Sequence, residues 1–276
     1  MNTNFNTIYY NILAEVVRDG STEYNSRTKQ ELLQLDPFSF TIDLSENDLP
    51  IPANRQYNPY IGAAECAWML SGSKSIEWIK KYTCIWDKFS VDGVMETAYG
   101  FRWREAFGRD QLAEAIETLR LDPTSRQVVL SAWNPSVDGL RSPMKLNIPC
   151  PISLILNIKD GRLNGQVIMR SSDLFVGLPY DVLTYSFILS SLAHELDYPL
   201  GSLTFFLAHP HIYAKHLELL DFKQWSSTKC YGLKLPNWKT SSILASKDYY
   251  MQTIQSLYDG TEPTTHKVKS RPEVFE

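Results

Sequence analysis

A cysteine and an arginine occupy the outer ends of a predicted pair of strands. Cys150 precedes an apolar run at residues 152–156, and Arg170 follows a second run at residues 163–169. The Asp160-Gly161 pair between the runs is typical of a tight turn, so we expect antiparallel strands with Cys150 at the entrance and Arg170 at the exit. A thiol reacts as its thiolate, and a nearby guanidinium favours that form and can also hold a phosphate. The stretch therefore predicts a nucleophile with its binding site.

Periodic patterns predict the elements that must position this stretch. Helical spacing covers residues 8–17, residues 60–82 with a break at Gly72, and residues 110–121 between Asp110 as N-cap and Pro123. Strand patterns cover residues 38–44 and 203–208, and a long helix is expected after Asp181. This mixture predicts an α/β (α+β) fold in which helices cover one side of a large mixed sheet.

The composition favours a single domain. The chain has 276 residues, of which 43% are hydrophobic, so it can bury a large core, and no linker divides residues 1–276 before a polar tail at residues 261–276. The net charge of −4 argues against a general surface for nucleic acid. Without a secretion signal or an apolar run of membrane-spanning length, we expect a cytoplasmic protein, or one in the host cytoplasm if it is viral.

The cysteines and histidines do not predict a metal site. The four cysteines have no CxxC spacing, and in a reducing compartment we expect reduced thiols instead of disulfides. The His209 and His211 pair suggests a metal, but no nearby acid or cysteine completes a set of ligands.

Ordered blocks along the chain resemble a known family. They are Trp86-Asp87, Tyr99-Gly100-x-x-Trp103-Arg104, Asp122-Pro123-x-Ser125-Arg126, Ser131-Ala132-Trp133-Asn134, Pro149-Cys150, Arg170-Ser171-x-Asp173-x-x-x-Gly177-Leu178-Pro179 and His211-x-Tyr213. In this order they resemble the thymidylate synthase family, which includes the deoxycytidylate hydroxymethylases. The resemblance implies a thymidylate synthase-like fold and a homodimer that forms sheet to sheet.

The resemblance also implies covalent catalysis on a pyrimidine nucleotide. Cys150 would add to C6 of the base, and C5 would then take a one-carbon unit from the co-substrate 5,10-methylenetetrahydrofolate. Glu65 lies among apolar neighbours and matches a family glutamate that manages protons through ordered water; the alternative is a surface glutamate. The predicted catalytic residues are Cys150, Glu65 and Asp181.

Basic and polar residues match family contacts to the nucleotide. Arg27, on a polar loop, is expected to fold over the phosphate, the alternative being a solvated loop arginine. Arg126 is expected to reach the phosphate in the partner subunit's site, although Gln127 replaces the second arginine of the family's pair and removes one charge. The set is completed by Arg170, Ser171 and Asp181, and by His211 and Tyr213 at the sugar 3′-hydroxyl.

The folate side of the site is expected to involve Trp86, Asn147, Asp173, Gly177 and Tyr180. In the family the tryptophan lies beside the pterin ring, and Asp173 matches the residue that bonds the pterin. Gly177 lets the backbone approach closely.

Base choice is predicted at Asp181, where thymidylate synthases have asparagine. An asparagine amide matches uracil with one donor and one acceptor, whereas an ionised aspartate offers only acceptors and suits the cytosine N4 amino group, and N3 once it is protonated. Deoxycytidylate hydroxymethylases carry aspartate here, and Pro151 in place of the family's histidine agrees with that branch. The alternative for Asp181 is an acid favoured by a helix N-terminus.

The predicted product is a hydroxymethyl group. Asn147 stands where thymidylate synthases usually place leucine, and a polar side chain there can hold the attacking water. The prediction is thus a dCMP 5-hydroxymethylase, suited to a bacteriophage that modifies its DNA bases. The alternatives are a dCMP 5-methylase, a dUMP-specific thymidylate synthase or hydroxymethylase, a CMP hydroxymethylase, and a noncatalytic nucleotide-binding relative. Residues 271–276 do not match the family's closing segment.

Overall fold

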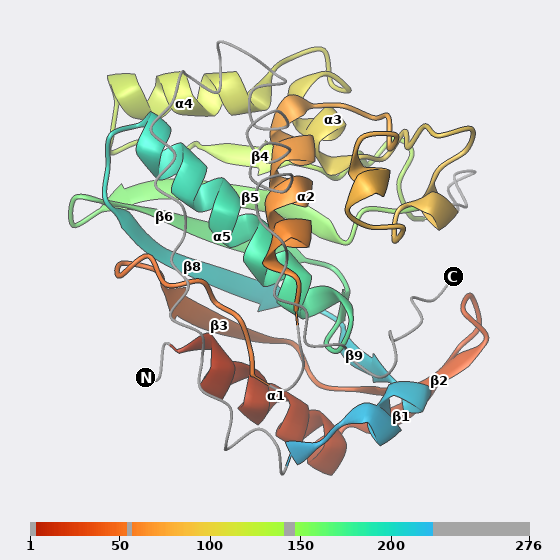
Figure 1. Ribbon diagram of the computed structural model, residues 1–276. Coiled ribbons are helices and arrows are strands. Elements are labelled where there is room, and N and C mark those ends of the chain that lie inside the picture. The colour runs from red at the N-terminus through yellow and green to blue at the C-terminus, as the bar shows by residue number, and fades with distance from the viewer. Residues whose placement is uncertain (1–3, 54–56, 141–146, 223–276) are drawn as a thin grey trace.

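A five-stranded mixed sheet forms the centre of the computed structural model, which describes residues 4–53, 57–140 and 147–222 (Figure 1). The strand order is β3, β8, β6, β5, β4, with β6 and β8 parallel and the other neighbours antiparallel. The bounds are β3 Phe38–Asp43, β4 Val129–Ser131, β5 Pro151–Lys159, β6 Arg162–Met169 and β8 Leu200–Leu207. The predicted α/β class with a mixed sheet is confirmed, while the tail at residues 261–276 and Cys230 lie outside the described residues.

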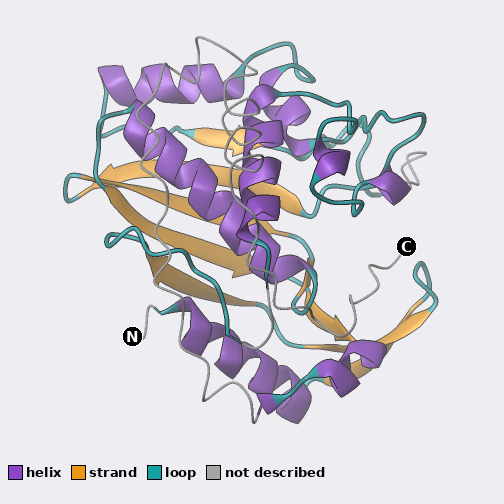
Figure 2. Cartoon of the chain, viewed as in Figure 1, coloured by secondary structure: helices purple, strands orange, loops and turns teal. Residues whose placement is uncertain are grey.

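Two helices, α2 (Pro59–Ser71) and α5 (Gly177–Glu195), pack together over one face of this sheet (Figures 1 and 2). Their contact depends on Gly62, because a Cβ there would lie 2.8 Å from Leu183 Cβ and 3.3 Å from the backbone nitrogen of Thr184. The close approach carries polar side chains of α2 and α5 to each other in the interior.

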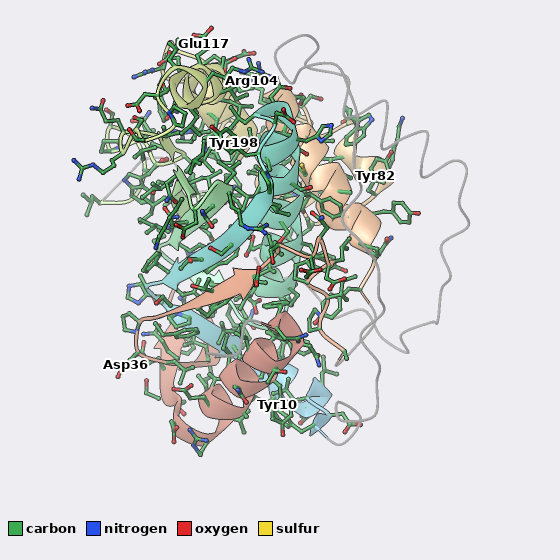
Figure 3. All side chains as sticks on the ribbon, turned by 90° about the vertical axis from the view of Figure 1, so that its left-hand side faces the viewer. Tyr10, Asp36, Tyr82, Arg104, Glu117 and Tyr198 are labelled. Carbon is green, nitrogen blue, oxygen red and sulfur yellow. The ribbon has the colours of Figure 1, made fainter. Side chains whose placement is uncertain are left out.

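The remaining helices extend the same core. They are α1 (Phe5–Asp19), α3 (Tyr99–Arg104) and α4 (Gln111–Leu121). Asp110 caps α4 by accepting from the Ala113 N–H over 3.0 Å, as the sequence predicts. In the view of Figure 3, α1 with Tyr10 lies at one end of the molecule and α4 with Glu117 at the other.

A second, smaller sheet lies beside the first. Its order is β1 (Ser21–Asn25), β2 (Gln30–Gln34), β9 (Pro210–Tyr213) and β7 (Ser172–Asp173). The strands β7 and β9 are parallel and pair Asp173 with His211. This sheet therefore brings residues from three distant parts of the chain to one edge.

The predicted hairpin of β5 and β6 is confirmed. Its turn residues Asp160 and Gly161 have φ values of 53° and 70°, the left-handed conformation that an Asp-Gly turn supplies. At the other end of the hairpin the pairing shifts between Pro151 and Ser153, directly after Cys150. A shift of this kind interrupts the regular pairing and can re-aim the residues next to it.

The sheet face opposite α2 and α5 is uncharged along its middle. Its side chains are half-buried or exposed and alternate with buried ones that face the helices. They are Ser39, Thr41, Val129, Ile155, Asn157, Gln166, Ile168, Thr204 and Phe206. We call this the open sheet face.

Residues 60–82 differ from the predicted pair of helices. The first helix ends where expected, since Gly72 adopts φ 73° as the C-cap of α2, but the second is only a 3₁₀ turn at Ile79–Lys81. The intervening backbone forms other bonds: the Ser75 N–H donates to the Ser73 hydroxyl, and the Ile76 N–H donates to the Gly93 carbonyl. Hydroxyl side chains that compete for backbone groups account for the difference.

No helix within the described ranges is long and apolar enough to cross a membrane.

Candidate active site

Arg170, at the end of β6, fastens the loop that holds Cys150. Its backbone N–H donates to the Cys150 carbonyl over 2.9 Å, and its side chain donates to the carbonyls of Pro149 (Nε, 2.8 Å) and Ile148 (Nη2, 2.7 Å). The guanidinium also lies 5.9 Å from the centre of the Trp133 ring. Arg170 thus braces the loop and places positive charge beside the thiol, and the half-buried Ser171 follows it directly.

Cys150 is a free, half-buried thiol. Burial raises its pKa, and Asp181 and Asp173 act in the same direction, whereas Arg170 and Arg27 lower it. The net pKa is raised, so the neutral thiol prevails in the free site even though two arginines favour the thiolate.

Arg27 lies at the tip of the β1–β2 hairpin, which the sequence analysis treated only as a polar loop. Asn25 Oδ1 accepts from the backbone N–H groups of Arg27 and Thr28, each over 3.0 Å, and shapes this tip. The Arg27 charge acts on both Cys150 and Tyr213, lowering the pKa of each against the effect of burial. The hairpin therefore brings Arg27 to the Cys150 site, where its role at a phosphate stays a prediction.

Glu65 is buried between α2 and α5, so the alternative of a surface glutamate is wrong. Its Oε1 accepts from the Trp86 indole N–H over 3.0 Å, and its Oε2 accepts from the Thr184 hydroxyl over 3.0 Å. Burial raises the pKa of Glu65 to about 7, although both hydrogen bonds act to lower it. A carboxyl that titrates near neutral pH can both give and take a proton.

Asp181 lies in α5 beyond its first turn, so a helix terminus is not what holds this acid in place. Burial raises the pKa of Asp181 well above the usual carboxyl value, and Glu65 and then Asp173 raise it further. Burial and the two neighbouring acids therefore shift Asp181 towards its neutral form in the free site, and its charge when it faces a bound base, predicted from the sequence to be ionised, stays a prediction. A Cβ at Gly177 would lie 3.5 Å from Asp181 Oδ2 and 3.6 Å from Asp173 Cβ, so the absent side chain leaves space between the two acids.

Two buried tyrosines join the site, and sequence reasoning assigned a role to neither. The Tyr99 hydroxyl bonds to the Cys150 backbone, and its pKa is raised well above the usual value by burial, by Cys150 and by Asp181. Burial, Asp181 and Cys150 also raise the pKa of Tyr185. Tyr185 follows Asp181 by one helical turn, a spacing that already placed both side chains on one face.

The smaller sheet contributes Asp173, His211 and Tyr213. Asp173 Oδ1 accepts from the backbone N–H groups of Phe175 (2.9 Å) and Val176 (3.0 Å), which fixes the carboxylate at the start of α5. His211 Nδ1 lies 3.0 Å from the His209 carbonyl, and because a carbonyl only accepts, Nδ1 carries a proton. In the neutral ring, Nε2 is then left as an acceptor suited to a hydroxyl.

The predicted folate residues lie on several elements. The Trp86 ring contacts Tyr99 edge to face at 5.8 Å, and the Tyr180 ring contacts Tyr57 at 5.7 Å. Asn147, three residues before Cys150, approaches the Met95 sulfur to 4.0 Å through its amide nitrogen. Aromatic rings, a carboxylate and the space at Gly177 suit a flat pterin with donor groups, so the residues present fit the co-substrate that the resemblance implies.

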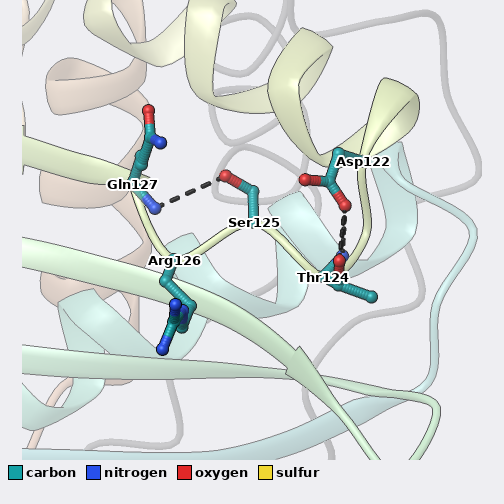
Figure 4. Close-up of a pocket in the computed structure, with 5 residues that line it drawn as sticks. All are labelled: Asp122, Thr124, Ser125, Arg126 and Gln127. Carbon is teal, nitrogen blue, oxygen red and sulfur yellow. Dashed lines mark hydrogen bonds between the residues drawn. The ribbon is translucent and has the colours of Figure 1, made fainter.

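Arg126 does not join the Cys150 site of its own chain. It lies on the exposed loop before β4, in a shallow depression lined by Asp122, Thr124, Ser125, Arg126 and Gln127 (Figure 4). The pairing of Val129 with Ile155 and Ser131 with Ser153 puts this loop at the opposite end of β5 from Cys150. At the usual rise of a strand, the separation along the sheet is roughly 25 Å.

Within the described residues, no group of three or more histidine, cysteine or acidic side chains can hold a metal ion.

Comparison with known proteins defines the class of this fold and site. A family model described as thymidylate synthase matches residues 7–256. A thymidylate synthase from Francisella philomiragia is 27% identical over 226 residues, which cover 77% of this chain and 82% of that protein. The class is that of transferases that add a one-carbon unit to C5 of a pyrimidine nucleotide with methylenetetrahydrofolate as co-substrate. The chain belongs to the thymidylate synthase family.

Proposed function

We propose that this protein is a dCMP 5-hydroxymethylase that acts through a Cys150 adduct at C6 of cytosine. The observation that carries the proposal is the buried Asp181, an acid at the predicted base-reading position whose pKa is raised by burial, by Glu65 and by Asp173. Glu65, with a pKa of about 7, lies close enough to influence it. A neutral acid that faces a pyrimidine can supply a proton as well as a hydrogen bond.

The proton on Asp181 favours cytosine over uracil during reaction. A neutral carboxyl has one donor and one acceptor, which match N3 and the N4 amino group of cytosine, but they also match uracil in the ground state. The difference arises when the thiolate adds to C6, because cytosine N3 is basic enough to take the proton and uracil O4 is far less basic. Asp181 would thus distinguish the bases mainly in the transition state, where selectivity counts.

The other residues have roles that follow from their positions. Arg170 and Arg27 supply positive charge for the nucleotide phosphate and for the thiolate as it forms. His211 and Tyr213 would hold the sugar 3′-hydroxyl, and Glu65 would exchange protons with the base and with water. Bound folate would supply the one-carbon unit, held by Trp86, Asn147, Asp173, Gly177 and Tyr180.

Asn147 supports water, instead of hydride, as the final reactant. Its amide lies in a half-buried position three residues from Cys150, beside the Met95 sulfur. A polar side chain at that depth can bind a water molecule that an apolar one would exclude.

The open sheet face supports the proposed homodimer. An uncharged face with exposed Phe206 and Val129 suits the same face of a second copy better than it suits solvent. A sheet-to-sheet dimer also offers a role for Arg126, which is too far from the Cys150 site of its own chain. We propose that Arg126 reaches the nucleotide phosphate in the partner's site.

The experiment is a competition among nucleotides. Purified protein is incubated with methylenetetrahydrofolate and equal amounts of dCMP, dUMP and CMP, and the product masses are read beside a Cys150→Ala control. Hydroxymethyl addition to dCMP alone is expected. A methyl product would reject the role of Asn147, and Asp181→Asn is expected to shift the preference towards dUMP. Absence of any product with dCMP still bound would overturn the enzymatic proposal.

A further inference from the structure

The Tyr185 hydroxyl is a polar group of this site to which the proposed reaction assigns no role. The side chain is 2% exposed, and its ring contacts Trp103 at 6.3 Å and Phe205 at 6.0 Å. Within the described residues the hydroxyl oxygen has no hydrogen-bond partner. Buried hydroxyls without a hydrogen-bond partner are uncommon and lower the stability of the fold, so we expect this hydroxyl to have a function.

Helix geometry directs Tyr185 towards Asp181. The two residues are four positions apart on α5, and side chains of a helix lean back towards its N-terminus, so the later side chain extends over the turn of the earlier one. The electrostatic effects agree with this direction. Burial raises the pKa of the Tyr185 phenol most, and Asp181 and then Cys150 raise it further. The phenol therefore lies within electrostatic reach of both the base-reading acid and the nucleophile.

Few of the titratable groups in the described part of the chain can stabilise a charge on Asp181. The titratable side chains around it are Glu65 on α2, Asp173 on β7, Tyr99 on α3, Tyr185 on α5 and Cys150 before β5. Two of these are carboxyls that oppose ionisation of Asp181, and Tyr99 already bonds to the Cys150 backbone. Tyr185 is the neutral donor with an uncommitted hydroxyl.

We propose that Tyr185 is a positioning residue for base selection, whose hydroxyl donates to the Asp181 carboxylate when that carboxylate forms. The inference rests on the proposed function. The Cys150 thiol first gives its proton to water. As the thiolate bonds to C6, the C5–C6 double bond shifts to C4–C5 and the electron pair of the C4–N3 double bond moves to N3. The Asp181 O–H bond then breaks and its proton bonds to N3, which leaves a carboxylate. Tyr185 then donates to that carboxylate. With uracil the proton stays on Asp181, so the same hydroxyl contributes little.

The first test measures Asp181 directly and needs no nucleotide. Tyr185→Phe keeps the ring between Trp103 and Phe205 and removes only the hydroxyl. We expect the pKa of Asp181, followed by NMR of ¹³C-labelled carboxyls, to rise so that its ionisation constant falls roughly ten-fold, because a donor to a charged group is lost. An unchanged titration of Asp181 would overturn the inference.

The control is Tyr9→Phe. Tyr9 is also a buried tyrosine, but its hydroxyl donates to the Leu174 carbonyl over 2.8 Å. This variant should lose stability and leave the Asp181 titration unchanged. If both variants shifted Asp181 equally, general loosening would explain the result and Tyr185 would have no special role.

The second test measures selectivity. In a dCMP and dUMP competition, Tyr185→Phe should lower the preference for dCMP roughly ten-fold, and it should have no effect on the preference in an Asp181→Asn background. An equal fall in both backgrounds would reject the link to Asp181. A parent protein without preference for dCMP would reject the proposed function, while the titration would still decide the role of Tyr185.

Discussion

The Thr184 hydroxyl donates to Glu65 Oε2 over 3.0 Å, across the contact between α5 and α2. The other carboxylate oxygen accepts from Trp86, so two helices and a loop hold one buried acid. Both bonds favour the charged form, yet burial prevails and raises the pKa to about 7. The pKa of Glu65 thus lies near neutral pH because burial and hydrogen bonding oppose each other, and each effect can be altered separately.

Glu65 makes the stability of the fold depend on pH. Its pKa rises from 4.5 to about 7 on folding, so between these values the folded state binds the proton more tightly than the unfolded state. The free energy of unfolding should therefore fall as pH rises through this window, by roughly 3 kcal/mol in full, and stay low above it. Urea denaturation across this range should show the fall in the parent and a flatter profile in Glu65→Gln. Equal slopes would contradict the assignment.

Thr184→Val should raise the pKa of Glu65 above about 7, because it removes a donor to the charged form. The lost hydrogen bond to a charged group corresponds to about 1.5–3 kcal/mol. The pH profile of kcat/KM should move to higher pH in Thr184→Val and stay in place in Thr184→Ser, which keeps the hydroxyl. A profile that moves equally in both variants would point to packing instead.

Arg170→Lys should slow the reaction of the Cys150 thiol. Lysine keeps a positive charge but cannot reproduce the planar donation to the Pro149 and Ile148 carbonyls. We expect alkylation of Cys150, followed by peptide mass spectrometry, to reach half its maximal rate at a higher pH than in the parent. The exposed Cys84 in the same sample is the internal control. A shift of the same size at Cys84 would show that the effect is not specific to Cys150 and would contradict the prediction.

Arg126→Ala and Cys150→Ala should each be strongly impaired alone and regain activity when mixed. In a mixed dimer, one site combines an intact Cys150 with an intact Arg126 from the other chain, and the open sheet face would form the interface. Activity after subunit exchange measures this directly. Lack of any regain, with mixed dimers present by native mass spectrometry, would rule out sharing of the arginine.

Local signals in the sequence were enough to predict several elements. Asp110 and Pro123 bracket α4, and Asp160-Gly161 forms the left-handed turn of the β5–β6 hairpin. These predictions succeeded because each depends on residues within one turn of the chain. The β1–β2 hairpin was missed because its first strand is almost wholly exposed and shows no alternation of polar and apolar residues.

The charge states of the site could not be predicted in the same way. The pKa of Asp181 is raised first by burial and then by Glu65 and Asp173, which belong to other elements. The role suggested for Tyr185 depends on the same distant groups. Residue type indicates which chemistry is available, whereas tertiary contacts decide which form of each group is present.

Gly62 carries no functional group, yet its substitution should disturb the hydrogen bonding of the buried acid Glu65. Any side chain there would collide with Leu183 and press on the backbone of Thr184, the residue that bonds Glu65. In a deep mutational scan, this glycine should therefore tolerate substitution as poorly as an active-site acid, although it carries no functional group. Variants that recover growth should replace Leu183 with glycine, because the atom in closest collision is the Leu183 Cβ, which every other residue keeps.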